Sequence, residues 1–262
     1  MSVDSTHLNN LKNIAGAKGY SDDPQTIDNH LIEPREKFKG RSPLVLYPDT
    51  TETVSKLVSY CHQHNIKIVP QSGNTGLVGG GVPDSSNDEI IISLKRMNKV
   101  RSEDPLNHAV TLESGVILAD AHDIASNLNC QFPMHLASEG SAMIGGNISS
   151  NAGGINVLQY GVMRDLVLGL EVVLPNGDIW NGLTGLRKDN TGYDLKQLFI
   201  GAEGTLGIIT AATLKLFPRH EQVNTAFVAI EPPESAIKLL SLAREISGDS
   251  LIAFEILPRI GL

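Results

Sequence analysis

The chain has 262 residues, 41% of them hydrophobic and 19% charged, and its 21 basic and 29 acidic side chains give a formal net charge of −8. This composition is typical of a globular protein and excludes a disordered chain. The acidic balance, without clusters of Lys and Arg, argues against a nucleic-acid partner. No apolar run is long enough to span a bilayer, so we expect no transmembrane segment.

The N-terminus and the cysteines indicate where the protein works. Residues 1–5 lack the basic and apolar regions of a secretory signal. The two cysteines, Cys61 and Cys130, do not form a disulfide framework. We therefore expect a cytoplasmic protein in a reducing compartment.

Residues 43–81 carry the first clear pattern of secondary structure. A short helix is predicted before it, over residues 6–15. The apolar run 44–47 predicts a strand, and a helix start at Asp49 precedes apolar residues spaced as on one helical face over 54–61. A second strand is predicted over 66–69. This β-α-β unit leads directly into a glycine-rich loop.

The middle of the chain alternates apolar runs with turn signals. Strands are predicted over 90–94 and 109–113, followed by a helix with apolar residues over 118–128. A hairpin is predicted over 166–180, because the turn sequence Pro-Asn-Gly-Asp stands between two apolar runs. A final strand is predicted over 208–217, closed by Pro218.

The pattern changes after Pro218. We predict a strand over 225–230, a helix opened by Pro232 and Pro233, and a strand over 251–256. Such a β-α-β unit cannot bury a core alone. We therefore expect an N-terminal helical segment over 1–39, a main domain over 40–218 and the incomplete start of a further domain over 219–262.

The loop after the second strand has five glycines in the nine residues from Gly73 to Gly81. Successive backbone N–H groups in such a loop can converge on an anion, and a phosphate or diphosphate is the natural ligand. The loop has neither the Gly-Lys-Ser/Thr of a P-loop nor the G-x-G-x-x-G spacing of a Rossmann fold. A flexible surface loop is the alternative.

Two further segments, 138–154 and 187–209, combine glycine with small polar residues. Small side chains leave room for a flat ligand, while Ser, Asn and backbone amides supply hydrogen bonds to its edge. A Gly/Ser linker is the alternative for the first segment, although its isoleucines disfavour it. Ordinary turn chemistry is the alternative for the second.

The histidines do not form a recognisable metal or catalytic pattern. His62 and His64 are two residues apart, which places them on different faces of a helix. His135 stands beside the second glycine-rich segment, but a lone histidine is more often structural. No Ser-His-Asp arrangement is evident. We therefore predict no metal site and assign no catalytic residue.

Taken together, segments 70–80, 144–154 and 186–207 resemble the FAD-linked oxidases of the p-cresol methylhydroxylase/vanillyl-alcohol oxidase type. Within that group, the chain is most similar to the D-lactate, D-2-hydroxyglutarate and glycolate dehydrogenase branch. The resemblance implies an α+β fold, namely a PCMH-type FAD-binding domain of two α+β subdomains with the flavin between them. It also implies that residues 219–262 are the first β-α-β of a truncated substrate domain.

The resemblance also implies which residues bind FAD. The first loop would hold the diphosphate, the second segment would line diphosphate and isoalloxazine, and the third would lie along ribose and adenine. In that order, they are Ser72, Gly73, Asn74, Thr75, Gly76 and Leu77; Gly140, Ser141, Gly145, Gly146, Asn147, Asn151 and Gly154; and Glu203, Gly207, Ile208 and Ile209. Covalent flavin members carry a histidine in the first loop, and this chain has none, so non-covalent FAD is expected.

The activity implied is FAD-dependent oxidation of a small D-2-hydroxy acid to the 2-oxo acid. Relatives of this kind continue into a domain with a His-rich metal-binding and catalytic region, so we expect this chain alone to have little or no activity. An electron-acceptor protein or quinone and a homodimer are the partners considered. The alternatives are a flavin-binding module or subunit without activity of its own, and a flavoenzyme of the same superfamily with another substrate.

Overall fold

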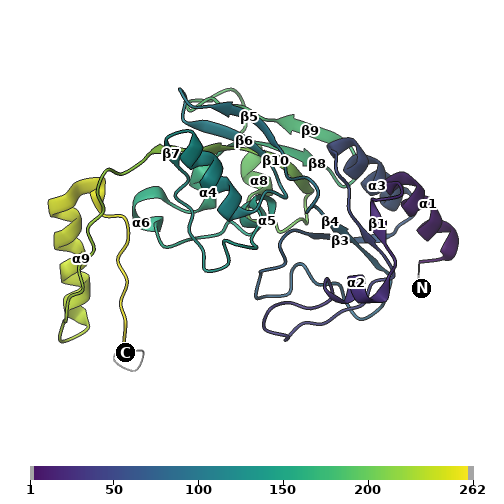
Figure 1. Cartoon of the computed structure of the whole chain (residues 1–262), viewed down its shortest axis with the longest axis horizontal. Coiled ribbons are helices and arrows are strands. Elements are labelled where there is room, and N and C mark those ends of the chain that lie inside the picture. Colours follow the sequence, from purple (N-terminus) through teal and green to yellow (C-terminus); the bar gives the residue numbers. More distant parts are fainter. Residues whose placement is uncertain (1–2, 259–262) are drawn as a thin grey trace.

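The computed structural model describes residues 3–258. Figure 1 shows two regions side by side, each built on a β-sheet, with the C-terminal helix α9 (Glu234–Ser247) standing apart from both. Mixed sheets and helices confirm the predicted α+β class.

The first region contains a four-stranded sheet in the order β1-β2-β4-β3. β2 and β3 both run parallel to β4, while β1 is antiparallel to β2. Its elements are α1 (Ser5–Ala15), β1 (Tyr20–Ser21), α2 (Pro24–Asp28), β2 (Val45–Leu46), α3 (Thr51–Gln63), β3 (Lys67–Gln71) and β4 (Glu89–Ser93). The predicted β-α-β unit is therefore present, with β4 inserted between its two strands.

Helix α3 forms where the apolar spacing predicts it, but it begins later than Asp49. Thr50 is its N-cap, with the hydroxyl accepting a hydrogen bond from the backbone N–H of Thr53 at 3.1 Å. Asp49 instead pairs with Arg96 at 2.7 Å. The apolar face of α3 is buried in a core that also contains Leu11 of α1. Helix α1 thus packs on the first region.

The second region is a five-stranded antiparallel sheet in the order β5-β6-β10-β8-β9. Its strands are β5 (Val100–Asp104), β6 (Ala109–Glu113), β8 (Val167–Val173), β9 (Ile179–Gly182) and β10 (Ile208–Lys215). The helices are α4 (Leu118–Asn127), α5 (Ile144–Ser149), α6 (Val157–Tyr160), α7 (Met163–Leu166) and α8 (Lys196–Phe199). A small sheet pairs β7 (Cys130–Gln131) with β11 (Phe217–Pro218).

The central strands β8 and β10 are buried along almost their whole length. One face packs on the core of the second region, which α4 and α5 help to form. Val173 and Ile208, at the paired ends of these strands, pack into the core of the first region instead. The two regions therefore share apolar packing at this end of the sheet.

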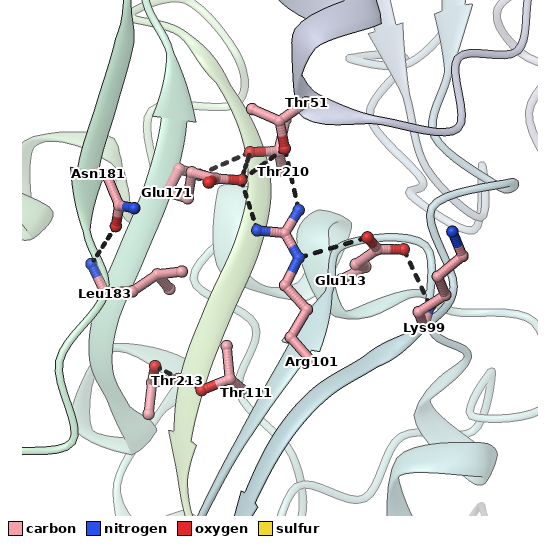
Figure 2. Close-up of polar contacts among 10 residues, drawn as sticks. All are labelled: Thr51, Lys99, Arg101, Thr111, Glu113, Glu171, Asn181, Leu183, Thr210 and Thr213. Atoms are coloured by element: carbon pink, nitrogen blue, oxygen red, sulfur yellow. Dashed lines mark hydrogen bonds and ion pairs between the residues drawn. The ribbon is translucent and has the colours of Figure 1, made fainter.

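A polar network around the buried carboxylate of Glu171 also joins the regions (Figure 2). The guanidinium of Arg101 on β5 donates to Glu171 on β8 at 2.8 Å and to the hydroxyl of Thr51 on α3 at 2.9 Å. Thr51 and Thr210 each donate to the same oxygen of Glu171, at 2.6 and 2.7 Å. This cluster fixes the start of α3 against the second sheet.

The two strands predicted after Pro218 are absent, and this prediction was wrong. Residues 223–230 and 251–258 are extended or irregular, and only helix α9 and a 3-10 turn (Gly248–Ser250) form between them. Within residues 3–258, no strand lies beside either segment to pair with its backbone. Without that pairing, apolar residues such as Phe227 remain exposed, at 83%. None of the described helices combines the length and the apolar character needed to cross a bilayer.

Candidate cofactor site

A cavity of about 290 Å³ lies between the two regions. The first region contributes Pro70 at the end of β3, the loop that follows it and Leu94 after β4. The second region contributes residues around α5 and the segment that enters β10. The three glycine-rich segments of the sequence thus meet around one hollow.

The loop after β3 presents unused backbone donors to this cavity. Among the described residues, no protein acceptor receives a hydrogen bond from the backbone N–H of residues 73–81. Two side-chain hydrogen bonds hold the loop in place. Asn74 Nδ2 donates to the carbonyl of Ile32 at 2.8 Å, and Gln71 Nε2 donates to the carbonyl of Gly81 at 2.7 Å. Free backbone N–H groups in a glycine-rich loop can bind a phosphate anion.

The first two glycine-rich segments touch each other so closely that side chains do not fit between them. A Cβ on Gly73 would lie 2.1 Å from the carbonyl oxygen of Ser141, and one on Gly146 would lie 2.9 Å from the Cβ of Ser72. The hydroxyl of Ser72 accepts the backbone N–H of Gly146 at 3.1 Å. Glycine is therefore required where the two walls of the cavity join.

Asn147 on α5 supplies a donor that the protein leaves unpaired. The residue is among those that line the cavity, it is only 5% exposed, and its buried Nδ2 has no hydrogen-bond partner among the described residues. A buried amide without a partner is costly, so such groups in native proteins point to a bound ligand or water.

The charged residues that line the cavity are Glu33 and Glu203; no Lys or Arg is among its lining residues. Burial raises the pKa of Glu33, but hydrogen bonds from the backbone N–H groups of Arg35, Lys37 and Phe38 outweigh it and leave this pKa below its ordinary value. Any anion in this cavity must therefore be bound by backbone N–H groups and neutral side chains.

The structure brings together most of the residues expected to bind FAD. Twelve of them line the cavity: Ser72, Gly73, Asn74, Thr75, Gly76, Gly145, Gly146, Asn147, Glu203, Gly207, Ile208 and Ile209. Five of them do not line it: Leu77, Gly140, Ser141, Asn151 and Gly154.

Three of the residues outside the lining make close contacts within the protein itself. Asn151 has a positive φ of 47° and its side-chain oxygen accepts the backbone N–H of Arg164 at 2.9 Å. A Cβ on Gly154 would lie 2.4 Å from the carbonyl oxygen of His135, so this glycine permits a close backbone contact. The carbonyl oxygen of Ser141 lies against Gly73, and a Cβ on Gly140 would meet no other atom within 4 Å.

Sequence reasoning missed several lining residues. The apolar residues Leu94 and Leu136 come from segments without glycine clusters, whereas Met143 lies within segment 138–154 but was not singled out. Glu33 comes from the N-terminal part of the chain, where the sequence showed no motif that indicates a binding site. Gln71 had a signal, since it directly precedes the first loop, and its side chain also bonds to His30.

Comparison with known proteins identifies this architecture. The family model described as "FAD binding domain" matches residues 42–182, more than half of the chain. The chain belongs to the FAD binding domain family. Its cofactor is FAD, and the PCMH-type fold predicted from the sequence is confirmed.

Several named proteins are similar in sequence to most of this chain. The D-2-hydroxyglutarate–pyruvate transhydrogenase of Saccharomyces cerevisiae is 43% identical over 236 residues, which are 90% of this chain and 47% of the relative. The mitochondrial D-2-hydroxyglutarate dehydrogenase of Arabidopsis thaliana is 42% identical over 98% of this chain and 45% of its own length. The chain thus spans about half the length of these relatives.

Solved structures share the fold of this FAD binding domain. An alkyldihydroxyacetonephosphate synthase superposes with a TM-score of 0.74 at 23% identity, covering 83% of this chain and 41% of its own. A variant of Phl p 4, a glucose oxidase, gives a TM-score of 0.66 at 18% identity, covering 81% and 44%. At this level of identity the likeness shows the fold alone.

The cavity has the chemical features that FAD requires. Free N–H groups of the first loop suit a diphosphate, and the unpaired Nδ2 of Asn147 suits an acceptor on the ligand. The lining also offers apolar surface, from Leu94, Met143 and Ile208 among others, for a flat ring system. The residues present therefore fit the cofactor of the family.

Proposed function

We propose that this chain supplies the FAD-binding part of a dehydrogenase that oxidises a small D-2-hydroxy acid to the corresponding 2-oxo acid. The cavity between the two regions is the main support for this proposal, because three separate glycine-rich segments line it. The names of the relatives, D-2-hydroxyglutarate dehydrogenase and D-2-hydroxyglutarate–pyruvate transhydrogenase, support the substrate class. When bound, FAD supplies the group that accepts a hydride.

The protein's contribution is to bind and orient the cofactor. In this proposal, residues 73–81 donate backbone N–H groups to the diphosphate, and Asn147 donates from its side-chain amide. Glu203 is a carboxylate and can only accept hydrogen bonds, so it suits ribose hydroxyls rather than phosphate. The apolar residues Ile208 and Ile209, which line the cavity, would lie along the flat part of the ligand.

We propose that FAD is held without a covalent bond. No His, Cys or Tyr is among the residues that line the cavity. Both cysteines are buried away from it, and burial raises the pKa of Cys61 to about 12, which keeps its thiol protonated and unreactive.

A flavin-binding module without activity of its own is the second candidate. It is favoured by the exposed apolar residues of α9 and its flanks, such as Ile237 at 71% and Phe227 at 83%, which leave room for another domain or subunit to complete the site. In either case we propose domain boundaries at residues 40 and 218, and a homodimer or an electron-acceptor protein or quinone as partner. We also propose a cytoplasmic location, although the relatives from Oryza sativa and Arabidopsis thaliana are named as mitochondrial proteins.

Anaerobic mixing tests the proposal. The FAD-loaded protein in its natural length and the present chain are each mixed with D-lactate, D-2-hydroxyglutarate or glycolate, with the L-enantiomers of the two chiral acids as controls. We expect loss of flavin absorbance with a D-acid in the natural-length protein and little loss in the present chain. If none of these acids reduces the flavin in either protein, the proposed substrate class is wrong. If the present chain alone is reduced rapidly, it does more than supply the FAD-binding part.

A further inference from the structure

Outside the cofactor cavity, two histidines and a glutamate converge on one point. His122 lies on α4, and His135 and Glu139 lie on the segment between β7 and α5. One side-chain ligand atom from each lies within 4.8 Å of the others. The individual distances to Glu139 Oε2 are 3.2 Å from His135 Nδ1 and 3.9 Å from His122 Nδ1.

We propose that His122, His135 and Glu139 form a binding site for a divalent transition-metal ion of the Zn²⁺ type, with one coordination position open to water or another ligand. This inference is independent of the proposed function, because it rests only on these three side chains and their supports.

The tautomer of His122 is fixed in the form that a metal needs. Its Nε2 lies 2.7 Å from the carbonyl oxygen of Met134, and since a carbonyl only accepts, Nε2 carries the hydrogen. The lone pair of a neutral ring is then on Nδ1, the atom that faces Glu139. Metal-binding histidines characteristically donate their second N–H to such an acceptor.

The backbone holds the three residues in place. The backbone N–H of Ala119, at the start of α4, donates to the carbonyl of Glu139 at 3.0 Å. The carbonyl of His135 accepts the N–H of Ile155 and lies against Gly154, where no side chain fits. The site is therefore built on hydrogen-bonded segments.

The spacing suits a tetrahedral ion. With metal–ligand bonds of about 2.0–2.2 Å, neighbouring ligand atoms lie about 3.4 Å apart. The observed distances of 3.2 and 3.9 Å bracket that value. The side chains of His135 and Glu139 are 43% and 42% exposed, which leaves a path for an ion and its water. Two imidazoles with a carboxylate favour Zn²⁺ over Mg²⁺, which prefers oxygen ligands.

An ion here would stiffen one wall of the cofactor cavity. Leu136 and Ser138, which line that cavity, lie between His135 and Glu139 in the chain. A metal bound to His122 on α4 would close this short segment into a ring anchored on the helix.

Equilibrium dialysis of the chelator-treated, FAD-free chain against ZnCl2, followed by metal analysis, tests the proposal. We expect one Zn²⁺ per chain, a rise in Tm with ZnCl2 and none with MgCl2. His122→Gln, His135→Gln and Glu139→Gln should each weaken Zn²⁺ binding at least about tenfold, since loss of even an outer hydrogen-bond partner costs 10–100-fold.

Two matched controls separate this site from charge effects and other histidines. Asp123→Asn removes an exposed negative charge beside His122, and His62→Gln removes a histidine on α3; both should bind Zn²⁺ as the unchanged chain does. Circular dichroism confirms that each variant is folded. The absence of a stoichiometric Zn²⁺, or equal binding by folded Glu139→Gln and His135→Gln variants, would overturn the proposal.

Discussion

Arg101 and Glu171 form the ion pair on which the contact between the two regions centres. The guanidinium donates at 2.8 Å to the oxygen of Glu171 that also accepts from Thr51 and Thr210 (Figure 2). Thr51 begins α3 in the first region, whereas the other three residues lie on the second sheet. The cavity for FAD lies between the regions that this network connects.

Arg101→Met should destabilise the protein strongly. It leaves the carboxylate of Glu171 buried without its cation, and breaking a buried pair from one side costs about 3–5 kcal/mol; because Arg101 is 26% exposed, we expect the low end, about 3 kcal/mol. Urea unfolding measures the change. Lys99→Met is the control: Lys99 is exposed and contacts Glu113 only through its backbone N–H and carbonyl, so loss of its side chain should cost less than about 0.5 kcal/mol.

Acid should weaken the native state through Glu171. Burial raises the pKa of this carboxyl, but hydrogen bonds from Thr51 and Thr210 and the charge of Arg101 outweigh it and leave the folded-state pKa below the ordinary value of 4.5. The stability it contributes is therefore complete above pH 4.5 and is lost as pH falls through the lower folded value. Below pH 4.5, unfolding free energy should fall less steeply in Glu171→Gln than in the unchanged chain. Equal slopes would show that Glu171 is not the linked group.

Asn147→Ala should weaken FAD binding without weakening the FAD-free protein. The variant removes a buried donor that is unpaired in the described structure, so Tm of the FAD-free chain should not fall. Loss of one hydrogen bond to FAD, worth about 0.5–1.5 kcal/mol, corresponds to about two- to twelvefold weaker binding.

The matched variant Asn151→Ala should behave in the opposite way. It loses the bond to the N–H of Arg164 and places Ala at a positive φ, so Tm should fall while FAD affinity stays unchanged. Calorimetric titration with FAD and thermal unfolding of both variants check these expectations. A larger effect of Asn151 than of Asn147 on FAD affinity would favour the assignment made from family resemblance over the cavity geometry.

Gly73→Ala should disrupt the junction of the two cavity walls. The added methyl would lie 2.1 Å from the carbonyl oxygen of Ser141, which is backbone and cannot rotate away. Such overpacking costs about 1–3 kcal/mol or more, and FAD binding should be lost with it. Gly140→Ala, whose methyl meets open space outside the cavity lining, should leave both Tm and FAD affinity unchanged.

Sequence periodicity predicted the helices and strands whose own residues show a clear apolar pattern. The apolar face of α3, the buried runs of β4, β8 and β10, and the Pro-Asn-Gly-Asp turn between β8 and β9 were all found as predicted. Strand β5 was missed because all five of its residues are exposed and three are charged. Its place depends on pairing with β6, which is a tertiary effect.

The strands predicted over 225–230 and 251–256 do not form, because a strand also depends on a neighbouring strand to pair with. Their composition favours a strand, but the described part of the chain offers no neighbouring strand to either of them. The sequence also did not predict that His122, His135 and Glu139 lie close together. His122 and His135 are separated by the end of α4 and by β7, and only the fold brings them together.

For the cofactor site, glycine-rich segments predicted the cavity but not every side chain that faces it. Glycine density marks close backbone contact, whether the neighbour is a ligand or the protein itself. At Gly154 that neighbour is the backbone of His135, whereas at Gly146 it is Ser72 on the cavity wall. Distinguishing the two requires the three-dimensional arrangement.

Titration of the FAD-stripped chain with FAD, followed by acid precipitation, tests most directly whether the cavity between the two regions is a cofactor site. The account predicts saturation at one FAD per chain, a change in the visible spectrum on binding, and release of all flavin into the acid supernatant. A chain that circular dichroism shows to be folded, yet takes up no FAD, would contradict it.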